Sequence, residues 1–485
     1  MNTNLTKLRA IQFKAICVIS ALILSIASGM AAAASIPSAD ARRLQPDRSM
    51  LLAQNTPSNI GKINNDLNLP KIGADVQITN TKSLTLKDAI DIAFRNNRDV
   101  QVARLAVDRD TAGIRSAQAD QALQIGLTST LQNQGSPVIF GTQATTSTNS
   151  NVQGQLQATY IILDAGRNSS SVRAAEDQVK FSKLDLLRIE QKLRGDVTTA
   201  YYDLQAADSS VIINQASITD AKRSLSDAQL QEKAGTGTKF DILRAQVQLA
   251  TADQNLVNAQ GQQQTARKNI AQLLSVDDNT EFTTADTVRE LGDWRYSLEE
   301  SIVLAYKKRP EIQQQLVNRS ISQQQQIIAA AADSPQVSLF ANYNLGKTLT
   351  DSTSAQDSYS VGAQLSWSFW DGGAARANSD RQKVNQEINE NQLTTQRNQI
   401  RFEIERAFYS LGTNKKNITT ATQSLQQAEE SLKLARLRFQ AGIGTQTDVI
   451  QAQTELATAR GNRVSAILNY NRALASLRVA TVLVE

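Results

Sequence analysis

Asp241 and Asp448 are the acidic residues whose surroundings most clearly indicate a defined role. Each lies three positions after a threonine, Thr238 or Thr445, at the end of a glycine-rich turn. A threonine followed three residues later by a carboxylate resembles a capping box, in which both side chains bond backbone N–H groups at the first turn of a helix. The spacing therefore predicts that a helix begins at each of these turns.

Few other residues are suited to catalysis. The chain has no histidine, and its one cysteine, Cys17, lies in the N-terminal apolar run. It also lacks a glycine motif that would cradle phosphate and a segment with clustered carboxylates. Because histidine is the commonest general base and a common metal ligand, we expect no enzyme activity, no metal site and no cofactor.

The N-terminus has the pattern of a secretory signal peptide over residues 1–34. Basic residues precede the apolar run 15–27, and Ala32–Ala34 supplies small residues for cleavage. An uncleaved anchor is the alternative, because the apolar stretch is near the length that spans a bilayer. Cleavage would remove three positive charges from a net charge of +5 and leave +2, which gives no argument for nucleic-acid binding.

Residues 35–83 carry four prolines and show no sustained hydrophobic period, so we interpret them as an extended or disordered lead-in. No later stretch approaches eighteen uninterrupted apolar residues. The sequence therefore argues against an α-helical integral membrane protein.

The rest of the chain consists of two similar halves. The turn beginning at Ala234 recurs at Ala441, 207 positions later, and the same offset aligns 194–204 with 401–411. A period this long indicates a duplicated half-domain. We place the first structural repeat at 84–290 and the second at 291–485.

Each repeat is predicted to contain a long helix and a returning helix. Apolar residues recur every seventh position from Ile404 to Phe439, and a second series at the same spacing, the alanine track, consists mainly of alanine. The first half shows the same pattern. Sustained heptads indicate helices that supercoil left-handedly, and Asn214 and Asn414 on the alanine tracks could fix their register. We predict long helices at 170–233 and 374–440, each on the order of 100 Å long, and returning helices at 239–275 and 446–482.

A pair of strands is predicted before each long helix, within 124–163 and 336–370. Alternating apolar and polar residues form four segments of about ten residues, the signature of outer-membrane barrel strands. We expect loops at 134–151 and 346–357. The edge of a soluble β-sandwich is the alternative. Aromatic residues near the strand ends could form an interfacial girdle: Tyr160, Tyr343, Tyr359, Trp367, Phe369 and Trp370.

Four strands cannot close a barrel, because single-chain outer-membrane barrels begin at about eight. Open sheet edges are not tolerated in lipid. If these strands enter a membrane, several copies of the chain must share one barrel, and the long helices would continue it as a helical tube.

The order of these elements resembles the TolC-like family of outer-membrane efflux channels. The local matches are the segment Leu86–Ala93, the turns Asp164-Ala-Gly166 and Asp371-Gly-Gly373, and the two Ala-Gly-x-Gly-Thr turns. The likeness covers about residues 84–482. It implies a homotrimer in the cell outer membrane that extends into the periplasm, with a twelve-stranded barrel continuous with an α-helical barrel.

The resemblance also implies a function and partners. Such a channel exports substrates as part of a tripartite efflux pump or a type I secretion system, together with a periplasmic adaptor protein and an inner-membrane pump or ABC exporter. A periplasmic coiled-coil adaptor or structural spacer is the alternative, although it would have no use for amphipathic strands. By resemblance, the adaptor would dock at the turns that contain Gly235, Gly237, Gly442 and Gly444.

Asp241 and Asp448 match acidic positions near the periplasmic entrance of such channels, where rings of carboxylates favour cations. Helix capping alone remains the alternative for both. Arg244 and Gln451 lie where a second acid would be expected, which puts strong cation selectivity in doubt. Lys239 in the first repeat also corresponds to the neutral Gln446 in the second. These differences predict that the glycine-rich turns, which form the helical tips, alternate in charge around a trimer.

Overall fold

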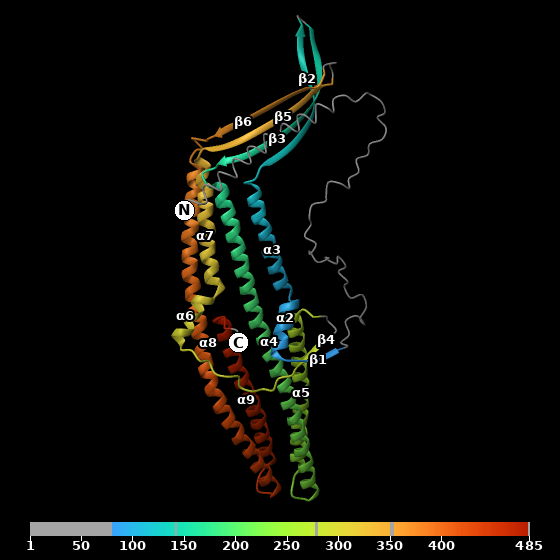
Figure 1. Cartoon of the computed structure of the whole chain (residues 1–485). Coiled ribbons are helices and arrows are strands. Elements are labelled where there is room, and N and C mark those ends of the chain that lie inside the picture. Colours follow the sequence, from blue (N-terminus) through green and yellow to red (C-terminus); the bar gives the residue numbers. More distant parts are fainter. Residues whose placement is uncertain (1–79, 141–142, 277–279, 350–353, 484–485) are drawn as a thin grey trace. The chain divides into compact units, whose positions relative to one another are not determined.

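The computed structural model describes residues 80–140, 143–276, 280–349 and 354–483, so the predicted signal peptide and residues 35–79 of the lead-in lie outside the described part. The helices and strands run in the order β1 (Asn80–Leu84), α2 (Leu86–Asn96), α3 (Arg98–Ala119), β2 (Gln124–Phe140), β3 (Gln143–Leu163), α4 (Arg167–Lys233), α5 (Lys239–Leu274), β4 (Thr280–Thr284), α6 (Leu298–Lys308), α7 (Pro310–Ala330), β5 (Gln336–Thr348), β6 (Gln356–Ser366), α8 (Ala374–Gln440) and α9 (Gln446–Ala480). Within this unit the sheet lies at one end of α3, α4, α7 and α8, and the glycine turns lie at the other end of α4 and α8 (Figure 1).

The four predicted strands form one antiparallel sheet in the order β2-β3-β5-β6. Two expectations are wrong in detail. Most of the predicted loop 134–151 is strand, because β2 and β3 stay paired from Gln124↔Thr159 to Phe140↔Gln143. The second pair ends earlier than predicted, since β6 stops at Ser366 and not at 370. The end of the predicted lead-in is also ordered: β1 pairs in parallel with β4.

Each strand pair passes into a long helix through the same sharp turn. Gly166 and Gly373 have φ of 85° and 88°, in the left-handed region that glycine adopts freely. The Asp164 carboxylate accepts hydrogen bonds from the backbone N–H groups of Gly166 (3.1 Å) and Asn168 (2.7 Å). Asp371 makes the equivalent bonds before α8, to Gly373 (2.8 Å) and Ala375 (2.6 Å). These carboxylates therefore satisfy donors that a helix start leaves unpaired.

The long helices α4 and α8 each have 67 residues, and α8 spans the range expected from its heptads. The heptad seams are buried, with Val197, Leu204, Ile400 and Ile404 fully inaccessible. The asparagines do not act as expected: Asn214 bonds to Ser210 and Asn414 to Ser410, each within its own helix. Neither side chain therefore fixes register between helices. No helix among the described residues has the length and hydropathy needed to cross a membrane.

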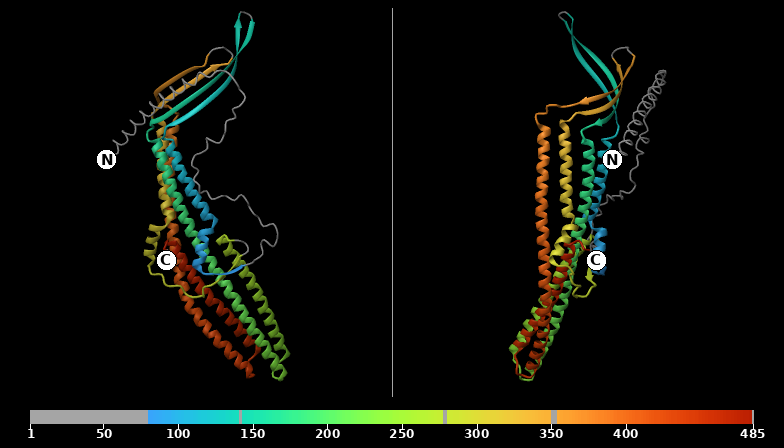
Figure 2. Two further views of the ribbon diagram at one scale, coloured as in Figure 1. Left: turned by 45° about the vertical axis from the view of Figure 1, so that its right-hand side comes forward. Right: turned by 60° about the vertical axis from the view of Figure 1, so that its left-hand side comes forward.

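The helices below the sheet lie in a row. Contacts join α5 to α4, α4 to α9, and α9 to α8, so α5 and α8 are the outer members. The short helix α2 packs against α4, and the short helix α6 packs against α8. Thr85 caps the start of α2, and Ser297 forms a capping box at the start of α6. The side-by-side arrangement of α3, α4, α7 and α8 is visible in the right-hand view of Figure 2.

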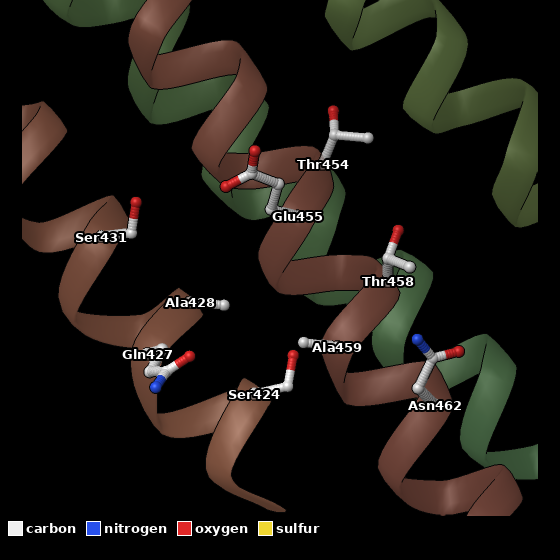
Figure 3. Close-up of a pocket in the computed structure, with 9 residues that line it drawn as sticks. All are labelled: Ser424, Gln427, Ala428, Ser431, Thr454, Glu455, Thr458, Ala459 and Asn462. Carbon is white, nitrogen blue, oxygen red and sulfur yellow. The ribbon is translucent and has the colours of Figure 1, made fainter. Parts of the chain in front are cut away.

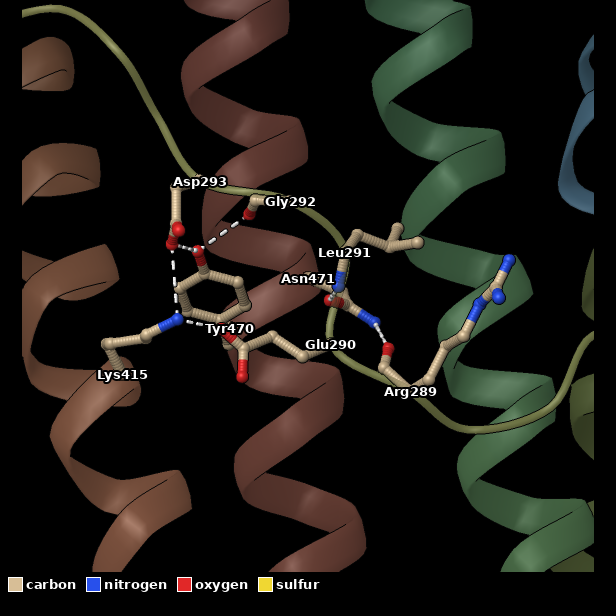
Figure 4. Close-up of polar contacts among 8 residues, drawn as sticks. All are labelled: Arg289, Glu290, Leu291, Gly292, Asp293, Lys415, Tyr470 and Asn471. Carbon is tan, nitrogen blue, oxygen red and sulfur yellow. Dashed lines mark hydrogen bonds and ion pairs between the residues drawn. The ribbon is translucent and has the colours of Figure 1, made fainter.

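The segment between β4 and α6 crosses α9 and is held by a polar network (Figure 4). The Tyr470 hydroxyl donates to the carbonyl of Gly292 (2.8 Å) and lies 3.2 Å from an Asp293 carboxylate oxygen. Asn471 accepts a hydrogen bond from the backbone N–H of Leu291 (3.0 Å) and donates to a backbone carbonyl of the same segment. Lys415 of α8 pairs with Asp293 at 3.1 Å and also with Glu290. One connecting segment therefore fastens α8 and α9 together.

We expect Tyr470→Phe to lower the free energy of unfolding by about 1–2 kcal/mol, because it removes a hydrogen bond and leaves its acceptors without this donor. Thermal unfolding followed by circular dichroism measures the loss. Tyr409→Phe is the matched control, since Tyr409 is 63% exposed. Equal midpoints for the two variants would contradict the anchoring role of Tyr470.

Candidate functional site at the helical tips

The two turns that join the long and returning helices depend on glycine in the same way. Gly235 and Gly442 have φ of 76° and 74°. At Gly237 an added Cβ would lie 3.0 Å from the backbone nitrogen of Glu232. At Gly444 it would lie 3.1 Å from the backbone nitrogen of Phe439. The four glycines are therefore required by the turn geometry itself.

Both predicted capping boxes are present. Asp241 accepts from the backbone N–H of Thr238 at 3.1 Å, and Asp448 accepts from that of Thr445 at 2.9 Å. Each aspartate N–H bonds in return to the threonine hydroxyl at 3.2 Å. The hydrogen bonds from Thr445 lower the pKa of Asp448 below its usual value. Both carboxylates are thus engaged in starting the returning helices.

The four predicted entrance residues do not form one cluster, because no hydrogen bond or ion pair joins any two of them among the described residues. Arg244 lies over the ring of Phe240, with its guanidinium carbon 5.2 Å from the ring centroid, and contacts the Thr447 hydroxyl of the second tip. Gln451 is exposed and donates to Glu455 of its own helix at 3.0 Å.

The side-chain amides of Gln231 and Gln446 also join the second tip to the first hairpin. Gln231 donates to the carbonyl of Phe439 at 2.8 Å. Gln446, only 1% exposed, donates to the Ser224 hydroxyl at 2.8 Å. Its counterpart Lys239 is exposed. The two tips therefore differ in packing as well as in charge, because Gln446 faces the first hairpin and not solvent.

An ion cluster further up the hairpins was not foreseen. Asp220 of α4 pairs with Arg436 of α8 at 2.7 Å and with Arg460 of α9 at 3.9 Å, and its carbonyl accepts from Gln453 at 3.0 Å. All three charged side chains are partly buried. This cluster links the two hairpins, as does the ion pair between Arg472 of α9 and Asp203 of α4 at 2.6 Å.

The 207-residue offset contained a signal for this cluster. The counterpart of Asp220 is the neutral Gln427, and the counterpart of Arg460 is the acidic Asp253. A charge that differs between two otherwise matching helices indicates a contact that only one copy makes. Comparing the repeats for charges that differ between counterparts would have pointed to Asp220 and Arg460.

A groove runs between α8 and α9 of the second hairpin, with a volume of about 430 Å³. Figure 3 shows Ser424 and Ala428 of α8 directed toward Ala459 of α9, and the longer side chains of Gln427, Glu455 and Asn462 also line the groove. Thr458 and Ser431 are exposed along it. Small residues leave room for another helix to approach closely.

The predicted interfacial aromatics divide into two groups. Tyr359, Trp367, Phe369 and Trp370 are exposed, by 78%, 51%, 77% and 86%. The last three lie after the end of β6, where Trp367 packs edge-on against Phe369. The remaining two, Tyr160 and Tyr343, are half-buried within the sheet.

Comparison with known proteins agrees with this arrangement. A model of the outer membrane efflux protein family matches residues 89–276 and 302–481. The chain is 25% identical over 408 residues to protein CyaE of Bordetella pertussis, covering 82% of this chain and 84% of CyaE. It is 23% identical over 402 residues to the toluene efflux pump outer membrane protein TtgI of Pseudomonas putida, covering 78% and 81%.

Solved structures share the fold. The outer membrane protein VceC of Vibrio cholerae superposes with a TM-score of 0.70 at 18% identity, covering 82% of this chain and 95% of VceC. The CmeC outer membrane channel of Campylobacter jejuni gives 0.72 at 15% identity, covering 86% and 93%. With the family model matched across both halves, the chain belongs to the outer membrane efflux protein family.

Proposed function

We propose that the protein is the outer-membrane duct of a tripartite efflux pump or a type I secretion system, with no catalytic chemistry of its own. One observation carries the proposal: a four-stranded sheet with unpaired edges leads through short connections into two long helical hairpins. The sheet would lie in lipid and the hairpins would extend the duct into the periplasm.

The duct is a homotrimer in this proposal. Strands β2 and β6 each have one edge that no described strand covers. Unpaired backbone groups cost several kcal/mol each in hydrocarbon, so the edges must pair with other copies. Three chains supply a barrel of twelve strands.

The helical part closes in the same way, by joining the outer helices of neighbouring copies. Apolar side chains on α5 are exposed at Phe240 (63%), Val247 (66%) and Val257 (65%). On α8, Leu434 and Leu437 are exposed by 57% and 55%. Packing α5 of one copy against α8 of the next would bury both sets and continue the barrel as an α-helical tube.

A periplasmic adaptor protein docks at the tips, and through it the duct connects to an inner-membrane pump or ABC exporter. The groove between α8 and α9 fits a helix of the adaptor, because its small side chains allow close approach of helix axes. The first hairpin differs there, since Ser224 is buried whereas its counterpart Ser431 is exposed along the groove. The two hairpins thus offer an adaptor different surfaces.

Opening of the entrance requires the two hairpins to separate. The Asp220 cluster and the Arg244–Thr447 contact hold them together in this conformation. Asp241 and Asp448 contribute charge near the entrance while they cap their helices, and Arg244 offsets part of it. This arrangement supports weak rather than strong selectivity for cations.

The membrane assignment predicts opposite results for neighbouring residues of β6. Val361 is 63% exposed on the apolar face, so Val361→Arg places a charge in lipid, at a cost of up to about 2–4 kcal/mol. Ser360→Arg, on the other face, should be tolerated. The effect is measured as the amount of trimer in the outer-membrane fraction on unheated SDS gels. A wild-type protein found only in the soluble fraction would favour a periplasmic spacer and overturn the proposal.

Gating predicts that Asp220→Asn loosens the tips, because Arg436 and Arg460 lose a charged partner worth about 1–3 kcal/mol. Spin labels at Thr236→Cys and Ile443→Cys, diluted with unlabelled protein, report the distance between tips. We expect a longer and broader distribution than in the parent. Asp253→Asn, at an exposed aspartate of α5, is the control; identical distributions in both variants would rule out the cluster as a restraint.

Docking is best tested in the groove, because any substitution of Gly442 strains the turn. Thr458→Trp fills the groove from an exposed position, and we expect export of a fluorescent substrate to fall about tenfold while trimer amounts stay normal. Thr458→Ser keeps the residue small and should export normally. Normal export by the tryptophan variant would exclude this groove as the docking surface.

A further inference from the structure

A second cavity, with a volume of about 630 Å³, lies midway along the hairpins between α2, α4, α9 and the segment that follows β4. On the sides formed by α2 and α9, apolar surface at Ile90, Leu474 and Val479 alternates with charged side chains. The side formed by α4 is polar. Three residues one turn apart, Arg194, Thr198 and Tyr202, line it and share one face of the helix.

Arg194 has no ion-pair partner among the described residues. Its guanidinium stacks on the Phe94 ring at 5.2 Å, but it makes no ion pair and no side-chain hydrogen bond with the described residues, and its Nε is buried without a partner. Burial lowers its pKa, against the opposing effect of the more distant Asp91 and Glu190. Arg194 as a whole is half-buried, and a partly buried charge without a partner costs stability, which a bound anion would offset.

Tyr202 presents an unused donor to the same cavity. Tyr202 is only 3% exposed, and its hydroxyl has no hydrogen-bond partner among the described residues. The neighbouring Tyr201 differs, since its hydroxyl bonds to the carbonyl of Leu84 at 3.1 Å and to Asp286 at 2.6 Å. Burial raises the pKa of Tyr202 to about 12. The hydroxyl therefore stays protonated and able to donate.

The second half of the chain shows what is missing. The counterparts of Arg194, Thr198 and Tyr202 at the 207-residue offset are Arg401, Glu405 and Tyr409. Arg401 pairs with Glu405 at 2.8 Å. In the first half that carboxylate is replaced by Thr198, whose hydroxyl donates to the backbone carbonyl of Arg194 at 2.7 Å and leaves the cation unpaired.

The charges around the cavity also favour an anion. Lys87 and Arg478 add positive charge to that of Arg194, whereas Asp91 and Asp286 supply the carboxylates of the wall. Asp286 is already engaged, because it accepts hydrogen bonds from the Leu86 backbone at 3.0 Å and from a tyrosine hydroxyl. The wall therefore carries an excess of positive charge beside apolar surface.

We propose that this cavity binds a small amphipathic molecule with one oxyanion head, a carboxylate or a phosphate. The head accepts hydrogen bonds from the Arg194 guanidinium and the Tyr202 hydroxyl, in the place that Glu405 fills in the second half. The apolar part of the molecule lies against Ile90, Leu474 and Val479. The site is separate from the tips and from the adaptor groove.

A neighbouring copy of the chain is not the source of this anion. The cavity is formed around α4 and α9, the two inner helices of the row α5-α4-α9-α8. Copies that close a barrel would meet at the outer helices α5 and α8. A free small molecule can enter a cavity in the middle of one chain, which the edge of another chain does not reach.

The test is binding to the purified full-length protein in a mild detergent, measured by equilibrium dialysis. The probes are 3-phenylpropionate, phenyl phosphate and the neutral 3-phenylpropionamide. We expect saturable binding of one anion per chain, at least tenfold tighter than that of the amide. A preference between the two anions identifies the head as carboxylate or phosphate.

Variants locate the site. Arg194→Gln should weaken anion binding at least tenfold and Tyr202→Phe several-fold, because each removes a donor to the head. Thr198→Glu supplies the carboxylate found in the second half and should abolish binding by pairing with Arg194. Arg401→Gln, the matched control at the exposed counterpart, should bind as the wild type does.

Two results would overturn the proposal. One is the absence of saturable anion binding to the wild type, or equal affinity for the amide. The other is wild-type affinity in folded Tyr202→Phe and Thr198→Glu proteins, which remain informative if Arg194→Gln does not fold. Binding is measured without export, so the outcome does not depend on the proposed duct function.

Discussion

The turn from strand to helix at Asp164 and Asp371 is the constraint on which the rest of this protein depends. Each carboxylate caps a helix of 67 residues while a glycine at positive φ changes the chain direction. Because α4 begins four residues after the end of β3 and α8 begins eight residues after the end of β6, the end of each strand pair sets where its long helix starts. Strand order and helix order are thereby coupled, and a family of outer membrane efflux proteins can keep both with little sequence identity.

Below that turn, apolar packing and polar contacts hold the helical hairpins together. The heptad seams bury Leu204 and Ile404 completely and hold each hairpin together along its length. The hairpins are joined to each other both by apolar packing, with Leu468 of α9 in one buried cluster with Leu204 of α4, and by polar contacts such as Asp220 with Arg436. Apolar seams are strong and lack direction, whereas partly buried ion pairs can break and re-form. Movement of one hairpin past the other would therefore have to break the ion pairs and also shift the apolar contact at Leu468.

The sequence predicted what depends on local periodicity. The heptads defined α8 over 374–440, and the Thr-x-x-Asp spacing identified both capping boxes. The strands were less predictable: 134–140 contains Gly, Ser and Pro, which favour turns, yet cross-strand pairing keeps it extended. The asparagines were misjudged because a bond to the preceding turn competes with one across helices. Asp220 and Arg436 are 216 residues apart, and no local pattern brings them together.

Differences between two matching halves are more informative than their similarities. A feature present in both, such as the paired glycines, is explained by the shared backbone geometry. A residue that differs has a surrounding that the other half lacks: Asp220 meets two arginines, and Gln446 turns inward where Lys239 meets solvent. Thr198 belongs to this set, since a threonine where the second half has Glu405 leaves the half-buried Arg194 without an ion pair beside the cavity. Substituting another residue for Arg194 would remove an unpaired charge, so its presence is better explained by an external anion than by stability.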